Sequence, residues 1–261
     1  MQPPTTPIFS QDLQPTGLEW GGSEFLFMER SRFRARSTRV ALRKLWLIYA
    51  EADLPMVAYA KVPADMLMFA VSAKNSGSPI WGGVRVDPRD IITIGSFQSL
   101  HLRTEGACRL TVICVQASEF KRYGLAVVGK PIDLPASIGR YRASPDAIKT
   151  LRELHSSAMR AFRAHAGRVA SAEAAHGLQQ QLIHALVLCV SREATPLFTT
   201  SGRRAYDVMT QFEEAVSRNT GHLRVTQLCS MLQVSEGVLR RCCKEFLGTA
   251  PSTYVRLHRD Q

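Results

Sequence analysis

Residues 225–259 read VTQLCSMLQVSEGVLRRCCKEFLGTAPSTYVRLHR, a stretch that predicts three consecutive helices. Its first part, 225–232, repeats apolar residues at helical spacing and is followed by a tight turn. Ser235 is placed to cap a second helix that runs to Leu247, and Pro251 begins a third. Two short helices joined by a turn of about three residues, the second of them basic, form the helix-turn-helix geometry.

The second helix separates its residues into an apolar face and a free, basic face. Leu239, Cys243 and Phe246 recur at the spacing of buried residues. Arginine suits bidentate bonding to guanine O6 and N7, and lysine can neutralise a phosphate. The pattern predicts that helix 235–247 lies in the major groove of double-stranded DNA. The residues predicted to contact DNA are Ser235, Gly237, Arg240, Arg241 and Lys244.

This stretch resembles the first helix-turn-helix of the AraC/XylS-type transcriptional regulators. The positions that match the family's spacing are Leu228, Cys229, Ser235, Leu239, Arg241, Lys244, Gly248, Pro251, Tyr254 and Arg259. The resemblance implies a sequence-specific DNA-binding regulator, with base-facing positions at Gly237, Arg240 and Arg241. It also implies a cupin-like N-terminal barrel that senses a small-molecule effector or mediates homodimerisation. It assigns no effector-binding residues.

Two departures from the family pattern affect what we expect. Gln233 stands at a turn position where the family often has glycine, and a left-handed backbone there costs on the order of 1 kcal/mol. The sequence ends at Gln261, near the start of the helix that in the family leads to a second helix-turn-helix. We therefore expect segment 203–261 to be marginally stable, with Tyr254 and Leu257 partly exposed.

The sequence between Arg36 and about Lys130 alternates short apolar segments with turn signals. Such spacing, near ten residues, predicts a β-sandwich or small β-barrel. The candidate strands are Val40–Ala50, Met66–Ser72, Trp81–Val86, Ile91–Ser96 and Arg109–Gln116. Ser144-Pro145 then resembles a helix start, and helical spacing continues to Val190 with one interruption near 166–167. An antiparallel helical pair is expected there.

The predicted fold class is α+β: an N-terminal cupin-like β-barrel with two following helices, then an all-α helix-turn-helix segment. The expected divisions are a loose arm over 1–30, a cupin-like effector-binding domain over 31–143, a helical dimerisation or packing pair over 144–192, a linker over 193–202 and a truncated DNA-binding domain over 203–261.

Composition is compatible with this expectation. The 261 residues carry a formal charge of +11, which favours polyanionic partners such as nucleic acid. The chain shows neither a membrane-spanning run nor a signal peptide, so we expect a cytoplasmic protein without a membrane partner. The six cysteines form no Cys-x-x-Cys pair, and reduced, structural thiols are expected.

A catalytic metal site would need more ligands than the sequence offers. The metal motif of cupin enzymes is matched in part by Gly95, His101 and Glu105. Arg103, however, stands where the motif requires a second histidine. We expect no metal, no cofactor and no enzymatic activity, with His101 a scaffold remnant or a surface side chain. Two alternatives stay open: a cupin-fold metalloenzyme with a helical appendage, and a truncated remnant that folds without regulating.

Two further groups allow a functional and a structural interpretation. The basic run Arg30, Arg32, Arg34, Arg36, Arg39, Arg43 and Lys44 could touch DNA phosphate or form a solvated strand face. Trp46, Phe69 and Trp81 could line an effector pocket or belong to the core.

Overall fold

The computed structural model describes residues 24–27, 35–42, 44–73, 77–132, 134, 138–164, 172–191, 194–219 and 223–259. The elements, in chain order, are β1 (Glu24–Phe27), β2 (Ala35–Leu42), β3 (Leu45–Ala52), β4 (Met56–Lys61), β5 (Met66–Ser72), β6 (Ile80–Trp81), β7 (Val84–Arg85), β8 (Asp90–Ile94), β9 (Ser99–Arg103), β10 (Cys108–Gln116), α1 (Ala117–Val128), β11 (Gly139–Arg142), α2 (Pro145–Ala164), α3 (Ala172–Val190), β12 (Thr195–Pro196), α4 (Thr200–Arg218), α5 (Val225–Leu232), α6 (Glu236–Leu247) and α7 (Pro251–Arg259).

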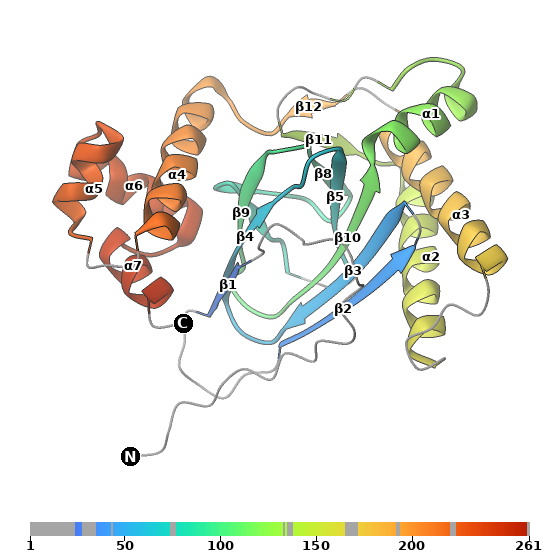
Figure 1. Cartoon of the computed structure of the whole chain (residues 1–261), viewed down its shortest axis with the longest axis horizontal. Helices are drawn as coiled ribbons and strands as arrows, with labels where there is room; N and C mark the ends of the chain where they lie inside the picture. Colours follow the sequence, from blue (N-terminus) through green and yellow to red (C-terminus); the bar gives the residue numbers. More distant parts are fainter. Residues whose placement is uncertain are drawn as a thin grey trace.

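The strands form two antiparallel sheets. Sheet A has the order β1-β4-β9-β6-β7, and sheet B has the order β12-β11-β8-β5-β10-β3-β2. Figure 1 shows four layers: helices α4–α7, sheet A, sheet B and helices α1–α3. The expected mixture of sheet and helix is confirmed, but the cupin-like barrel is not closed. Among the described strands no ladder joins the two sheets, which instead share an apolar core.

Both faces of sheet B are buried. Trp46 and Val112 point toward sheet A, while Leu47 and Ile113 belong to the cluster under α1–α3. Strands buried on both faces read as continuous apolar runs instead of alternating ones. For this reason the sequence pattern merged β2 and β3 into one expected strand, Val40–Ala50, although a turn at Lys44 separates them.

Three other expected strands are found, one with the expected ends and two with shifted ends, including Ile91–Ser96, which is β8 (Asp90–Ile94). Met66–Ser72 is β5 as expected, and Arg109–Gln116 is β10 with one more residue. The expected strand Trp81–Val86 is instead a hairpin, because Gly82 and Gly83 turn the chain with φ values of 53° and 80°. Positive φ at both central residues is the signature of a type I′ hairpin turn. Strands β4 and β9 and helix α1 were not expected.

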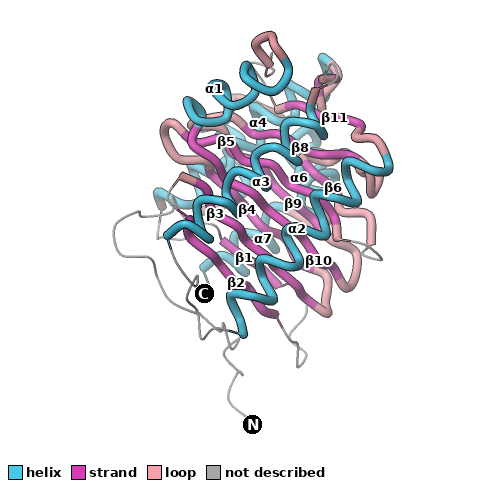
Figure 2. Tube along the Cα trace, turned by 90° about the vertical axis from the view of Figure 1, so that its right-hand side faces the viewer, coloured by secondary structure: helices cyan, strands magenta, loops and turns pink. Residues whose placement is uncertain are grey.

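The helical pair is confirmed as α2 and α3, which lie side by side across sheet B (Figure 2). Ser144 caps α2 as expected, since its Oγ accepts the amide of Ala147 at 3.2 Å. The pair buries an apolar stripe against the sheet, represented by Leu151, Met159 and Leu186. These contacts assign the pair a packing role, and its role in dimerisation stays a prediction.

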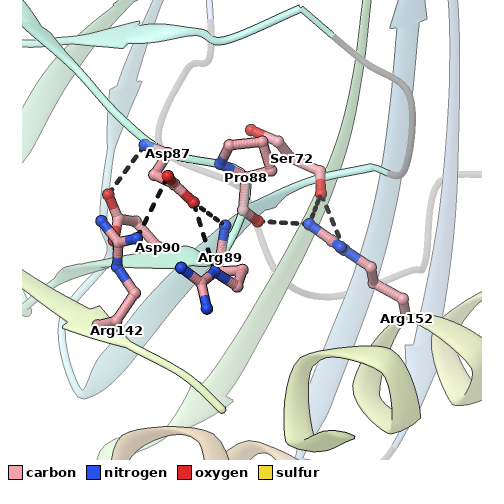
Figure 3. A network of polar contacts seen from close by, with 7 residues as sticks. All are labelled: Ser72, Asp87, Pro88, Arg89, Asp90, Arg142 and Arg152. Carbon is pink, nitrogen blue, oxygen red and sulfur yellow. Dashed lines mark hydrogen bonds and ion pairs between the residues drawn. The ribbon is translucent and has the colours of Figure 1, made fainter. Parts of the chain in front are cut away.

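A polar network fixes the start of this pair on the sheet (Figure 3). The guanidinium of Arg152 on α2 donates to the carbonyl of Ser72 at 2.8 Å and to that of Pro88. Beside it, Arg142 Nε lies 2.7 Å from the buried Asp90 Oδ1. The network joins β5, the β7–β8 turn, β11 and α2, so α2 has one position on the sheet.

The expected N-terminal arm falls mostly on residues 1–23, which lie outside the described part of the chain. Its later part contains β1, paired antiparallel with β4. Among the described helices, none is long and apolar enough to cross a membrane.

Candidate nucleic-acid interface

Helices α4–α7, together called the helical module, build the expected helix-turn-helix. Their shared core consists of side chains at most 1% exposed: Met209, Phe212, Leu228, Leu239, Cys243, Phe246 and Tyr254. Helix α4 precedes α5 and packs on both α5 and α6. The expectation that Tyr254 is partly exposed is wrong, because α7 folds its aromatic side chain into this core.

The turn between α5 and α6 needs a left-handed residue. Gln233 has a φ of 52°, and its amide donates to the carbonyl of Ser230 at 3.3 Å. The neighbouring amide of Val234 donates to the carbonyl of Cys229 at 3.1 Å. The carbonyls that end α5 are satisfied by this turn, and a non-glycine residue adopts the strained backbone.

Helix α6 begins and ends as the sequence predicts. Ser235 Oγ accepts the amide of Val238 at 3.4 Å, and Gly248 ends the helix with a φ of 72°. Leu239 and Phe246 are fully buried on one side of the helix. The helix is therefore anchored mainly through this apolar face.

The opposite face of α6 is exposed and carries the residues predicted to contact DNA. Arg240, Arg241 and Lys244 are exposed, as are Ser235 and Gly237. A Cβ added at Gly237 would meet nothing within 4 Å, so the backbone of this turn is open to a large partner. Ser235 serves first as the helix cap. Structure and sequence agree on which side of α6 is free.

Glu236 is a residue on this face that the sequence interpretation missed. Its Oε1 lies 2.5 Å from Arg240 Nη2, and the two side chains are 47% and 67% exposed. The spacing of four residues along a helix was the available signal, because acid-base pairs at this spacing are neighbours. The pair partly neutralises the positive face of α6.

The metal motif is not assembled. His101 is 3% exposed and its Nε2 lies 2.9 Å from Glu213 Oε2 on α4. Glu105 instead pairs with Arg85 at 2.6 Å and with Arg103 at 3.1 Å. The expectation of a surface histidine is therefore wrong. Within the described ranges, no group of three His, Cys, Asp or Glu side chains is placed to hold a metal ion.

His101 is buried because the helical module packs on the outer face of sheet A (Figure 1). The phenol of Tyr206 on α4 donates to the carbonyl of Ser99 on β9 at 2.8 Å. The ring of Phe246 on α6 lies 6.4 Å from the ring of His101. A Cβ at Gly83 would approach Glu245 Cγ to 2.8 Å, so the β6–β7 turn touches the side of α6.

The described part, 194–202, of the segment expected as a linker (193–202) is built into the fold. Thr195 and Pro196 form β12 on the edge of sheet B. The ring of Phe198 packs on Tyr206 at 5.1 Å and on Phe246 at 6.5 Å. Thr199 then caps α4 by accepting the amide of Gly202 at 3.2 Å. The module is thus attached through a short, packed connection.

The basic run ahead of β3 divides between described and undescribed residues. Arg30, Arg32, Arg34 and Arg43 lie outside the described part of the chain. Lys44 pairs with the buried Glu119 at 3.1 Å, so its charge stabilises the start of α1. That contact gives Lys44 a structural role, and contact of the basic run with DNA phosphate stays a prediction.

The three aromatic side chains considered for an effector pocket are core residues. Trp46 and Trp81 are 7% and 3% exposed and lie in the cluster shared by both sheets and the module. Phe69 is fully buried on the other face of sheet B, where its ring packs 5.0 Å from that of Phe120. They do not share one pocket.

The cysteines are free thiols, as expected. Cys242 is 4% exposed, which agrees with the structural role expected for the cysteines. Burial raises the pKa of Cys242 and that of Cys243 above their ordinary values. Both therefore stay protonated and act as small apolar side chains in the module.

Comparison with known proteins gives structural likeness only. No family model matches the chain, and no curated protein sequence does. The AraC-like transcriptional activator CuxR aligns over 91% of this chain and 84% of its own, with 12% identity and a TM-score of 0.46. ToxT from Vibrio cholerae O395 aligns over 87% of this chain and 79% of its own, with 13% identity and a TM-score of 0.33.

Proposed function

We propose that this protein is a sequence-specific DNA-binding transcriptional regulator that places α6 in the major groove of double-stranded DNA. The observation that carries the proposal is the division of α6 into a buried apolar face and an exposed face bearing Arg240, Arg241 and Lys244. A helix held along one side with cations on the other is what major-groove reading requires. The resemblance of residues 225–259 to the AraC/XylS motif supports the same function.

In this proposal the exposed residues have separate roles. Arg240 and Arg241 bond to base edges, and Lys244 neutralises a phosphate. Gly237 lets the helix backbone approach the groove closely, because it adds no side chain there. Ser235 fixes the first turn of α6 and keeps its amides directed at the DNA.

Control of DNA binding is assigned to the β-domain and its helical pair. We propose that a small-molecule effector, or homodimerisation through α2 and α3, changes how α6 is presented. The metalloenzyme alternative needs a free His101, and that imidazole is bonded to Glu213 instead. No described cluster supplies the remaining ligands.

The test distinguishes sequence-specific contacts with base edges from non-specific attraction to the DNA phosphates. An operator is first selected from random-sequence duplexes, and binding is measured by fluorescence anisotropy over a salt series. Arg240→Ala or Arg241→Ala should cost about 1–3 kcal/mol on the selected site and leave random DNA nearly unaffected. Lys244→Ala should weaken both by the same factor and lower the salt slope by about 1.

The matched control is Arg122→Ala on α1, which removes an exposed arginine remote from α6. It should leave both affinities unchanged. Equal losses on selected and random DNA for the two α6 arginines would contradict the roles proposed for them. Unchanged binding in all three α6 variants would refute the proposed interface.

A further inference from the structure

The contact between sheet A and the helical module converges on one carboxylate. Glu213 on α4 is 1% exposed. Its Oε2 lies 2.9 Å from His101 Nε2 on β9, and the Tyr254 hydroxyl on α7 donates to Oε2 at 2.9 Å and to Oε1 at 3.1 Å. The three side chains come from three elements, of which only β9 belongs to the β-domain.

The surroundings of Glu213 are apolar and aromatic. The ring of Tyr59 on β4 lies 4.8 Å from that of His101, and the ring of Phe212 lies 5.7 Å from that of Tyr254. A carboxylate buried in such a place is tolerated only when hydrogen bonds replace its water. Burial, aided by the charge of Glu213, raises the pKa of Tyr59 to about 12, so this phenol stays neutral.

We propose that His101, Glu213 and Tyr254 form a latch through which sheet A holds the helical module in one orientation and can release it. The consequence for DNA rests on the proposed function, since the latch then controls the presentation of α6. The latch itself is a property of the protein without DNA.

A carboxylate at position 213 makes the packing of the helical module on sheet A specific in its orientation. It also makes this packing reversible. The attraction comes from apolar contacts such as Phe246, and these tolerate small rotations. A buried carboxylate between a donor of the module and a donor of the sheet is satisfied in one arrangement only. When the module lifts away, water replaces the bond to His101, so opening costs less than it would with an apolar side chain at 213.

The position of His101 connects the latch to the interior of the β-domain. Alternate residues of β9 point to opposite faces, so Leu100 and Leu102 face the core between the sheets while His101 faces the module. The amide of Gly82 holds the carbonyl of His101 at 2.9 Å. His101 therefore lies between the core of the two sheets and Glu213, so the position of β9 sets the position of the donor to Glu213.

The latch is tested by hydrogen exchange of the full chain without DNA, resolved by peptide. His101→Phe keeps an aromatic ring against Tyr59 but removes the donor to Glu213. We expect at least a tenfold loss of protection in α4, α6 and α7, with β10 unchanged. Glu213→Gln should give the same pattern with a smaller loss. The triple variant His101→Phe/Glu213→Leu/Tyr254→Phe removes all three polar groups of the latch and should recover wild-type protection or exceed it.

The control is Glu214→Gln, the same chemical change on the adjacent, exposed residue of α4, which should alter nothing. Wild-type protection of the module in His101→Phe would overturn the proposal. A loss shared equally by β10, in both His101→Phe and Glu213→Gln, would overturn it too, because the defect would then be one of general stability. Failure of the triple variant to recover the protection of α4, α6 and α7 would also overturn the proposal.

A second arm uses random-sequence duplex DNA. Wild type and the Glu214→Gln control, which lies outside the latch and leaves the exposed charges of α6 unchanged, should bind within about twofold of each other. If the wild-type chain binds no duplex, the proposed function fails, while the exchange result still decides the latch. If exchange shows no latch and the duplex binds, only the latch is refuted.

Discussion

Arg240 Nη2 lies 2.5 Å from Glu236 Oε1, one turn back along the exposed face of α6. Both side chains are exposed, so the contact contributes little to folding. The contact mainly affects charge. In the protein without DNA, Glu236 holds the guanidinium of Arg240 along the helix and partly cancels its positive potential. For the base contact proposed above, Arg240 would have to give up its ion pair with Glu236 in whole or in part.

Replacing Glu236 by Gln should therefore tighten binding to random-sequence DNA. The gain comes from removing a carboxylate that repels phosphate, since Arg240 is proposed to contact base edges and contributes little on random DNA. We expect an affinity gain of a few-fold at low ionic strength that shrinks as salt rises, measured by fluorescence anisotropy. Glu214→Gln is the matched control, because Glu214 forms the same four-residue pair with Arg218 on α4. An equal gain in the control would show that net charge alone is responsible and that the position of Glu236 on α6 has no effect.

Replacing Gln233 by Gly should stabilise the module. The left-handed backbone at a φ of 52° is strained for glutamine and relaxed for glycine, and the side chain is exposed. We expect the free energy of unfolding in urea to rise by about 0.5–1 kcal/mol, after the greater freedom of glycine in the unfolded chain is subtracted. Gln211→Gly, in the middle of α4, should destabilise by about 1 kcal/mol. A lower free energy of unfolding in Gln233→Gly would contradict the claim that the backbone at position 233 is strained.

Removing the cap of α6 should weaken it. Ser235→Ala deletes the oxygen that accepts the amide of Val238, at a cost of about 1 kcal/mol in urea unfolding. The frayed first turn should also reduce affinity for DNA, since the first turn carries Glu236 and Gly237. Ser217→Ala, an exposed position of α4, should be neutral or slightly stabilising. If Ser235→Ala leaves the free energy of unfolding unchanged, the turn at 233–235 holds α6 in place without the Ser235 cap.

The protein should lose stability between about pH 6.5 and pH 4 in part through His155. This side chain of α2 is 1% exposed, and burial lowers its pKa from 6.5 to about 4. In this window the unfolded chain binds a proton that the folded chain excludes. Stability therefore falls as the pH falls, by up to about 3 kcal/mol in total, and levels off below pH 4.

His155→Gln tests this contribution, because an amide fills the site without titrating. The variant should show a shallower fall of the urea midpoint between pH 6.5 and pH 4. His176→Gln, at an exposed position of α3, should keep the wild-type slope. Identical slopes for wild type and His155→Gln would exclude His155 as the source.

The sequence by itself determined the elements whose signals are local. The cap at Ser235, the stop at Gly248, the start at Pro251 and the apolar spacing of α6 all act within a few residues. Helix formation depends on such short-range bonds, so the exposed face of α6 was predictable. Ser144 and α2 followed from the same kind of signal.

The tertiary structure alone decided where the helical module sits. Glu213 shares the apolar stripe of α4 with Tyr206, Met209 and Val216, and this acid in an apolar position was the only hint of a buried partner. Its partner His101 lies 112 residues earlier. Which strand faces a helix across such a separation depends on sheet pairing and on the packing of whole surfaces, and spacing along the chain does not encode either. The open pair of sheets in place of a closed barrel has the same origin.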